Sequence, residues 1–193
     1  SADGTVVLCH DTTLERYGHG PRPVEAMPAA ELLALDMGSF FSPHLYGGEP
    51  MLTLERLFEN FGDRFTYHVE IKGRAAQLPR QVVDIIQAGG VADRCIVTSF
   101  SYEALQATRA CSDLPLGWLV QAIDAKTCQQ ANNLDLLQLC PRADLATPQM
   151  TQVAKQTVKQ VRAWGAGGTP AEVAAKLRNA VDVWEQVIAL APG

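Results

Sequence analysis

Short apolar runs rich in β-branched residues alternate along this chain with stretches that repeat apolar residues at helical spacing. The apolar runs are typical of strands. Because they are continuous rather than alternating with polar residues, both faces of each strand are expected to be buried, as in a parallel sheet. The predicted strands cover residues 5–10, 65–71, 95–100, 116–120, 135–140 and 161–164.

Stretches with apolar residues three or four positions apart separate these runs and predict helices. Thr53 and Ser101 are placed as N-caps, and Thr169 precedes a proline at a first helical position. A capped turn or short helix is predicted over residues 11–16, with Asp11 or Thr12 as its cap. The other predicted helices cover residues 28–35, 53–61, 78–88, 101–109, 125–131, 151–159 and 170–190.

This regular order of strand and helix predicts an α/β chain built from βαβ units around a parallel sheet. An open doubly wound sheet and a barrel both satisfy the order. No Gly-x-Gly-x-x-Gly, Walker-type or Gly-x-Ser-x-Gly motif follows a strand, so nucleotide binding and the common hydrolase elbow have no support.

Charge and hydropathy narrow the possible partners. The 193 residues carry 16 Lys and Arg against 21 Asp and Glu, a formal net charge of −5. Because such a surface repels phosphate backbones and no basic patch offsets it, no nucleic-acid partner is expected. No apolar stretch approaches the ~20 residues that a membrane span needs, so no transmembrane segment is expected either.

The cysteines show neither a Cys-x-x-Cys pair nor the spacing of a metal site: Cys9, Cys95, Cys111, Cys128 and Cys140. Cys9, Cys95 and Cys140 lie in apolar runs, where a thiol behaves as a small buried hydrophobe. We therefore expect structural thiols in a reducing, cytoplasmic compartment rather than a disulfide framework.

Polar residues stand where several predicted strands end. His10 ends the first, Glu70 and Lys72 end the second on one face, Ser99 and Phe100 end the third, and Trp164 ends the last. In a (β/α)8 barrel, active sites form at these strand ends, and a charge there is costly without a partner. The set predicts acid/base chemistry on an anionic substrate, with a hard cation held by carboxylates.

Each of these residues also has a purely structural interpretation that the residues alone leave open. His10 could cap a turn, Glu70 and Lys72 could form an ion pair on an edge strand, and Trp164 could belong to the core. The remaining histidines are expected at the surface or in loops: His19, His44 and His68.

Five segments in fixed order carry a more specific signal. They are residues 3–16, which contain His10-Asp11; residues 48–55; Val69-Glu70-Ile71-Lys72; Val97-Thr98-Ser99-Phe100; and Val161-Arg162-Ala163-Trp164. In this order and at similar spacing, they resemble motifs of the glycerophosphodiester phosphodiesterase family. The first resembles its second-histidine segment, the next its Pro-Thr-Leu-Glu helix start, and the others its Glu-Ile-Lys, Ser-Phe and tryptophan strands.

The resemblance implies a single, incomplete TIM-type (β/α)8 barrel domain over residues 1–193. It implies hydrolysis of a small-molecule glycerophosphodiester to glycerol 3-phosphate and an alcohol, with Ca²⁺ or Mg²⁺, in glycerol and lipid metabolism. His10 would be one of two general acid/base histidines, and Glu70 a metal ligand. Lys72 would contact the phosphate, and Phe100 and Trp164 would line the pocket for glycerol or the leaving group.

The chain also departs from the family pattern. The family's His-Arg-Gly and Glu-x-Asp strands would precede Ser1, so we expect the first one or two βα units, the other histidine and the remaining metal carboxylates to be missing. The chain by itself is then expected to be an incomplete enzyme. Residues 165–167 read Gly-Ala-Gly where Thr-Val-Asn is common, and the closing Gly-x-Asp-Gly strand is not recognisable in residues 181–193.

Two alternatives remain beside this hypothesis. In the first, a desolvated Lys72 forms a Schiff base with a carbonyl substrate, as in an aldolase-like barrel. In the second, the chain is a non-catalytic relative that binds phosphodiesters or a membrane surface, and the missing Glu-x-Asp strand is its signature.

Overall fold

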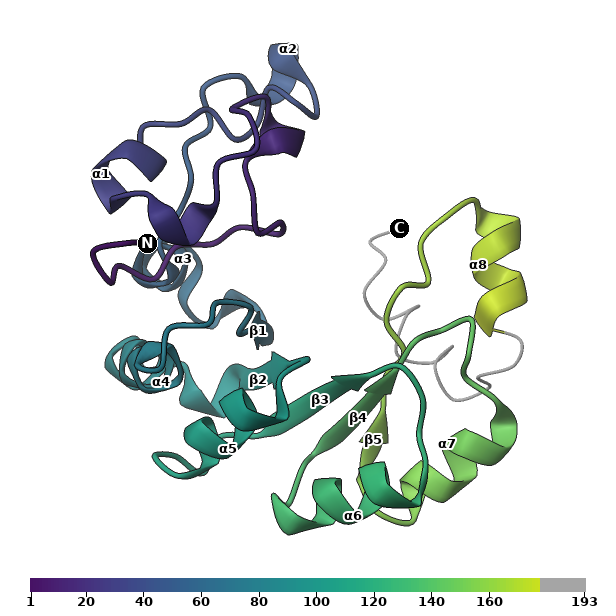
Figure 1. Ribbon diagram of the computed structural model, residues 1–193. Coiled ribbons are helices and arrows are strands. Elements are labelled where there is room, and N and C mark those ends of the chain that lie inside the picture. Colours follow the sequence, from purple (N-terminus) through teal and green to yellow (C-terminus); the bar gives the residue numbers. More distant parts are fainter. Residues whose placement is uncertain (178–193) are drawn as a thin grey trace. The chain divides into compact units, whose positions relative to one another are not determined.

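The computed structural model describes residues 1–177, and the contacts within it divide the chain into two units (Figure 1). The first unit holds residues 1–67 and 72–95, and the second holds residues 68–71 and the chain from residue 96 onward. Two predictions lie outside the described residues: the end of the helix predicted over residues 170–190, and the lack of a recognisable closing strand in residues 181–193.

The second unit is built on a five-stranded sheet whose strands lie side by side in the order of the sequence. The strands are β1 (Tyr67–Glu70), β2 (Cys95–Ser99), β3 (Leu116–Val120), β4 (Gln138–Pro141) and β5 (Gln160–Val161), although Tyr67 and Cys95 count with the first unit. From β2 to β5 each neighbouring pair is parallel, as the apolar runs predict.

A helix follows each strand from β2 to β5, and the first three of these helices return the chain to the start of the next strand, as parallel pairing requires. These helices are α5 (Tyr102–Arg109), α6 (Ala125–Asn133), α7 (Pro148–Lys155) and α8 (Pro170–Leu177). Figure 1 shows α5, α6 and α7 along one side of the strands. Ser101 caps α5 as predicted, because its hydroxyl accepts a hydrogen bond of 3.1 Å from the N–H of Ala104.

One row of residues crosses the sheet at equal height. Thr98 lies opposite Gly117, and Gly117 lies opposite Gln138. The Gln138 side chain is buried, and its Nε2 donates a hydrogen bond of 2.7 Å to Oε1 of Gln160 on β5. A Cβ at position 117 would lie 3.0 Å from Oε1 of Gln138 and 3.0 Å from a methyl of Thr98. The glycine therefore leaves the room that the buried glutamine occupies.

The first unit is largely irregular. Its helices are α1 (Ala29–Leu32), α2 (Pro43–Tyr46), α3 (Leu54–Phe61) and α4 (Leu78–Ala88), and its 3-10 turns are Glu15–Tyr17, Val24–Ala26, Gly62–Arg64 and Ala92–Arg94. Thr53 caps α3 as predicted, with its hydroxyl 3.1 Å from the N–H of Arg56. A small core holds the loops together and consists of Leu14, Val24, Met27, Leu32 and Met51.

Carboxylates fix the irregular backbone of this unit. Asp36 accepts hydrogen bonds from the backbone N–H groups of Gly38, Ser39 and Gly48 and from the Ser39 hydroxyl. These bonds, led by the one from the Ser39 hydroxyl, hold the pKa of Asp36 well below its ordinary value. Asp3 accepts from the N–H of Ala29 at 3.0 Å, where α1 begins.

The prediction of a sheet strand over residues 5–10 is wrong. This segment forms an isolated antiparallel bridge in which Val7 lies opposite Thr53, and the N–H of Leu8 donates to the carbonyl of Leu52. Most of the segment is only partly buried. Its β-branched residues therefore pair with one neighbouring segment and do not form a strand that is buried on both faces of a sheet.

The predicted cap of residues 11–16 is wrong as well. The 3-10 turn there begins only at Glu15, with Leu14 before it and no side-chain cap. The carboxylate of Asp11 is engaged elsewhere, within 2.7 Å of both His10 and Arg16.

Several boundaries in the second unit shift from those predicted: β4 begins at Gln138 rather than residue 135, α6 ends at Asn133 rather than residue 131, and α7 ends at Lys155 rather than residue 159. Helix α7 begins at Pro148 rather than residue 151, because Thr147 caps it with a 3.2 Å bond from the N–H of Met150. The last strand is shorter than predicted, and Trp164 follows it in an isolated parallel bridge with Arg142.

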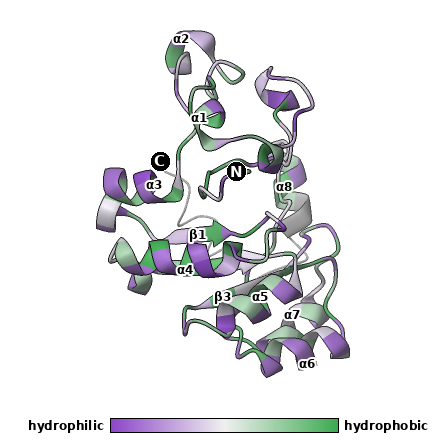
Figure 2. Cartoon of the chain, turned by 60° about the vertical axis from the view of Figure 1, so that its left-hand side comes forward, coloured by the Kyte–Doolittle hydropathy of each residue, from purple (hydrophilic) through white to green (hydrophobic). Residues whose placement is uncertain are grey.

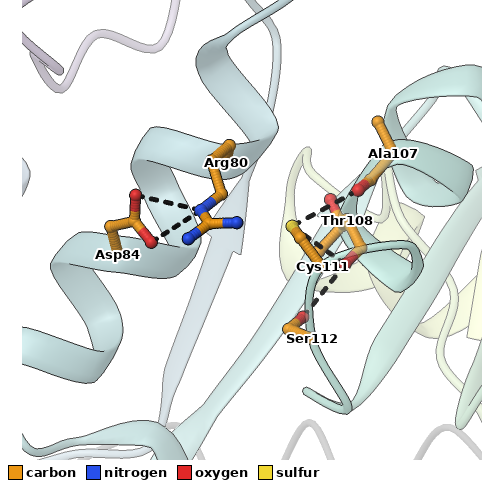
Figure 3. A network of polar contacts seen from close by, with 6 residues as sticks. All are labelled: Arg80, Asp84, Ala107, Thr108, Cys111 and Ser112. Atoms are coloured by element: carbon orange, nitrogen blue, oxygen red, sulfur yellow. Dashed lines mark hydrogen bonds and ion pairs between the residues drawn. The ribbon is translucent and has the colours of Figure 1, made fainter.

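All five cysteines are free thiols. Cys95 and Cys140 are buried as expected, and burial raises their pKa to about 11 and about 12, whereas Cys9 is only partly buried. Figure 3 shows the thiol of Cys111 donating to the carbonyls of Ala107 and Thr108 at the end of α5. It also shows the ion pair of Arg80 with Asp84 on α4 in the other unit. Within residues 1–177, no helix has the length and apolar character to cross a membrane.

Candidate active site

The predicted site residues fall in both units. His10 and Lys72 belong to the first unit, and Glu70, Phe100 and Trp164 belong to the second. Each set is described within its own unit.

An exposed imidazole held by a carboxylate is the chemical centre of the first unit. Nδ1 of His10 lies 2.7 Å from Oδ1 of Asp11, whose other oxygen lies 2.7 Å from Nε of Arg16. Because an ionised carboxylate only accepts hydrogen bonds, Nδ1 carries the proton and donates it to Asp11. In the neutral ring, Nε2 is then the basic nitrogen that can take or give a proton.

Asp11 is ionised at neutral pH. Its pKa is lowered from the ordinary value chiefly by the hydrogen bond with His10, and also by the positive charge of Arg16. A carboxylate in this position orients the ring and stabilises the imidazolium form. Sequence reasoning missed this role of Asp11, and its place directly after His10 was the available signal.

Lys72 lies against the same segment. Its ammonium donates a hydrogen bond of 2.7 Å to the backbone carbonyl of His10 across 62 positions of sequence. The turn after Lys72 is tight, because a Cβ on Gly73 would lie 2.6 Å from Leu78 and 2.8 Å from the carboxylate of Glu25. That carboxylate also accepts from the N–H of Arg74 at 2.7 Å. No sequence signal marks Glu25 as the residue that fixes this turn.

The second unit brings Phe100 and Trp164 together. Their rings meet edge to face, with centroids 4.9 Å apart and planes at 86°. The indole N–H of Trp164 donates to the carbonyl of Val120 at 3.0 Å, and that of Trp118 donates to the carbonyl of Phe100 at 3.3 Å. The two indoles thus anchor an aromatic pair that leaves Phe100 exposed.

Glu70 is the last residue of β1, and its neighbour Ile71 ties it to β2. The N–H of Ile71 donates a hydrogen bond of 2.8 Å to the backbone carbonyl of Thr98. The buried hydroxyl of Ser99 donates one of 2.7 Å to the carbonyl of Ile71. Glu70 itself is half-buried, with one carboxylate oxygen inside the protein. In the part of the chain that the structure describes, no three His, Cys, Asp or Glu side chains come together as a metal site.

Comparisons with known proteins point to one family. A model described as "Glycerophosphoryl diester phosphodiesterase family" matches residues 1–182. A glycerophosphodiester phosphodiesterase of Caldanaerobacter subterraneus is 26% identical over 167 residues, which cover 84% of this chain and 68% of that protein. One from Bacillus subtilis is 25% identical over 179 residues, covering 84% of this chain and 60% of that protein.

Solved structures share the fold of this chain. A phosphodiesterase of Oleispira antarctica, in complex with the product sn-glycerol-3-phosphate, matches with a TM-score of 0.83 and 24% identity over 98% of this chain and 80% of that one. A glycerophosphodiester phosphodiesterase of Thermotoga maritima matches with a TM-score of 0.66 and 19% identity over 99% of this chain and 81% of that one. These likenesses confirm the predicted α/β barrel class. The roles of His10, Glu70, Lys72, Phe100 and Trp164 stay predictions.

Proposed function

The chain belongs to the family of glycerophosphoryl diester phosphodiesterases, which are phosphoric diester hydrolases, and we propose that its own reaction is hydrolysis of a glycerophosphodiester to glycerol 3-phosphate and an alcohol. The substrate class is supported by the names of its relatives and by the glycerol 3-phosphate bound in the Oleispira structure.

The observation that carries the proposal is the contact between Lys72 and His10. The bond from Nζ of Lys72 to the His10 carbonyl brings a positive charge to the backbone of the residue that carries the imidazole. A phosphodiester carries one negative charge, and more builds up on its oxygens as the nucleophile attacks. A lysine stabilises that charge, and the neighbouring imidazole supplies proton transfer.

In the proposed mechanism His10 acts as a general acid/base at Nε2. Asp11 accepts from Nδ1, holds the ring orientation and stabilises the imidazolium. Lys72 binds a phosphate oxygen. Phe100 and Trp164 form an apolar wall for the glycerol carbons or the leaving group, because an edge-to-face pair presents ring surface without a competing hydrogen-bond donor.

We also propose a divalent cation, Ca²⁺ or Mg²⁺, with Glu70 as one ligand. Either ion takes about six or more oxygen ligands, of which Glu70 provides at most two. The residues that the structure describes do not complete such a site. When bound, the cation would neutralise phosphate charge, and no step assigned here to His10 or Lys72 depends on it.

The Schiff-base alternative loses its premise. It needs a desolvated, neutral amine at Lys72, but this side chain is exposed and its ammonium donates to a carbonyl. The non-catalytic alternative is separated by the experiment below.

The experiment uses two readouts on the full-length protein that contains this chain, because the chain by itself is expected to be incomplete, and glycerophosphocholine is the substrate probe. Release of glycerol 3-phosphate is measured with added Ca²⁺ or Mg²⁺ and again with a chelator, and binding of sn-glycerol 3-phosphate is measured by calorimetry. We expect release that the chelator suppresses. His10→Ala should lower kcat by about 100-fold or more, as for loss of a general acid/base.

Matched variants separate chemistry from binding. His44→Ala, at another exposed histidine of the same unit, should leave kcat unchanged. Lys72→Gln should weaken glycerol 3-phosphate binding at least tenfold. A full-length protein that binds glycerol 3-phosphate without releasing any from the diester would favour the non-catalytic alternative. A full-length protein that does neither would refute the proposed function.

A reducing, cytoplasmic compartment is a further part of the proposal. It is supported by the five cysteines, all of which are free thiols and two of which, Cys95 and Cys140, are buried. Mass spectrometry of the protein from its native cells would contradict this if any of these cysteines were disulfide-bonded.

A further inference from the structure

One loop of the first unit exposes an unusual amount of apolar surface. The loop runs over residues 36–50 and is called the aromatic loop below. Phe41 is 75% exposed and Leu45 is 74% exposed, and Phe40 and Tyr46 beside them are also exposed. Figure 2 shows α2, which lies in this loop, with one stretch in the hydrophobic colour beside paler and purple ones. A contiguous exposed apolar patch typically marks an interaction surface.

The patch is held open by the backbone beneath it. Asp36 binds three backbone N–H groups at both ends of the loop. A Cβ on Gly38 would lie 2.0 Å from the carbonyl oxygen of Tyr46, so the two sides of the loop touch where only glycine fits. Because this packing fixes the loop, the exposed rings cannot gain burial by a collapse onto the core.

The charge of the loop selects among possible partners. Residues 37–48 contain no Lys, Arg, Asp or Glu, whereas the whole chain carries a formal charge of −5. A protein partner recognised by ion pairs has nothing to bind here, and an anionic surface would be repelled by the rest of the chain. Exposed Phe, Leu and Tyr side chains on a charge-free tip match the boundary between lipid headgroups and acyl chains.

The patch is continuous with the candidate active-site segment. Phe41 packs on Phe40, and Phe40 meets Tyr17 edge to face with centroids 4.9 Å apart. Tyr17 and Cys9 both pack against the small core of the first unit, and Cys9 directly precedes His10 in the chain. The aromatic rings therefore lead from the exposed tip to the core on which the segment before His10 packs.

We propose that the aromatic loop is a docking surface for electrically neutral, zwitterionic lipid surfaces. Phe41 and Leu45 enter the boundary between headgroups and acyl chains, and Phe40 and Tyr46 lie at the headgroup level. Docking needs no net charge on the lipid and does not depend on hydrolysis, so it stands or falls separately from the proposed function.

The test is co-sedimentation of the chain with phosphatidylcholine vesicles at 0.1 M and 0.5 M salt. We expect binding that salt leaves unchanged, and a partition coefficient at least tenfold lower for the double variant Phe41→Ser/Leu45→Ser. The control is Leu145→Ser/Val153→Ser, which removes two exposed apolar side chains from the second unit and should bind as the wild type does. Circular dichroism and sedimentation velocity on each variant check folding and self-association.

A gain-of-signal variant keeps the proposal testable if the double variant misfolds. Leu45→Trp should be quenched by brominated phosphatidylcholine, whereas Val153→Trp should not. Absence of wild-type binding to phosphatidylcholine would overturn the proposal, as would binding confined to anionic vesicles. A wild-type dimer that the double variant abolishes, without vesicle binding, would assign the loop to contacts between copies of this chain and would overturn it equally.

Discussion

In the second unit each strand is followed by a helix, each strand from β2 onward pairs in parallel with the next, and apolar side chains fill the space between them. In the first unit the chain follows no repeat, and single carboxylates such as Asp3 and Asp36 satisfy the backbone where regular pairing is missing. The first unit holds the proposed acid/base and the aromatic loop, and the second holds the aromatic pair of Phe100 and Trp164. Regular structure thus serves as scaffold here, while irregular backbone carries reactive and exposed groups.

This difference between the two units predicts that a Leu→Ala substitution lowers the free energy of unfolding by unequal amounts in their two cores. Leu116→Ala, at the centre of the sheet, should lower the free energy of unfolding by about 4 kcal/mol, because paired strands cannot collapse into the cavity. Leu14→Ala, in the small core of the first unit, should cost only about 2 kcal/mol, because loops relax more readily. Urea denaturation measures both, and a larger loss for Leu14→Ala would break the comparison.

Asp11→Asn tests whether a polar contact in the first unit acts on chemistry rather than on folding. The amide keeps the shape but cannot stabilise the imidazolium, so kcat should fall by about tenfold. The kcat–pH profile should also shift to lower pH, because the variant lacks the negative charge that lies 2.7 Å from the imidazole ring. The thermal midpoint should stay unchanged, since the pair lies at the surface. An unchanged pH profile would show that Asp11 does not act on His10.

Acid should loosen the first unit before the second. The folded-state pKa of Asp36 lies below its unfolded value, so the stability it contributes is complete above about pH 4 and is lost as pH falls through the folded pKa. Hydrogen-exchange protection of the Gly38, Ser39 and Gly48 amides should therefore fall severalfold between pH 5 and pH 2. Protection in β3, which no carboxylate maintains, serves as the internal reference, and an equal loss there would contradict the comparison.

Helix caps should show the smallest difference between the units. Thr53 in the first and Ser101 in the second make the same 3.1 Å contact with an N–H three residues on. Thr53→Ala and Ser101→Ala should each lower the free energy of unfolding by about 1 kcal/mol. Because a cap acts locally, costs that differ by more than about 1 kcal/mol would mean that the surrounding unit decides its value.

The sequence predicts the second unit far better than the first. Continuous apolar runs and caps such as Ser101 are local signals that the sheet and its helices obey, and β3 and α4 begin and end where the pattern predicts. Residues 5–10 carry the same β-branched signal but pair with Thr53 instead of joining the sheet. Their place is decided by a partner more than 40 positions away, which no local pattern contains.

The candidate site shows the same division. The edge-to-face contact of Phe100 with Trp164 follows from their positions at strand ends in a repeated architecture. His10 and Asp11 are neighbours in the sequence, yet the hydrogen bond between their side chains was not predicted. An Asp before a turn is explained equally well as an N-cap. The Glu25 carboxylate that fixes the turn after Lys72 has no signal at all, since 49 positions separate Glu25 from Arg74.

Gly117 has a consequence for how this sheet can change over time. A Cβ at position 117 would lie 3.0 Å from atoms of both Thr98 and Gln138, so both neighbours would have to shift to admit even an alanine. Loss of Gln138 alone would leave the amide oxygen of Gln160 without its donor. The side chains at positions 98, 117 and 138 therefore limit one another in size, and a larger residue at position 117 needs smaller ones on both neighbouring strands.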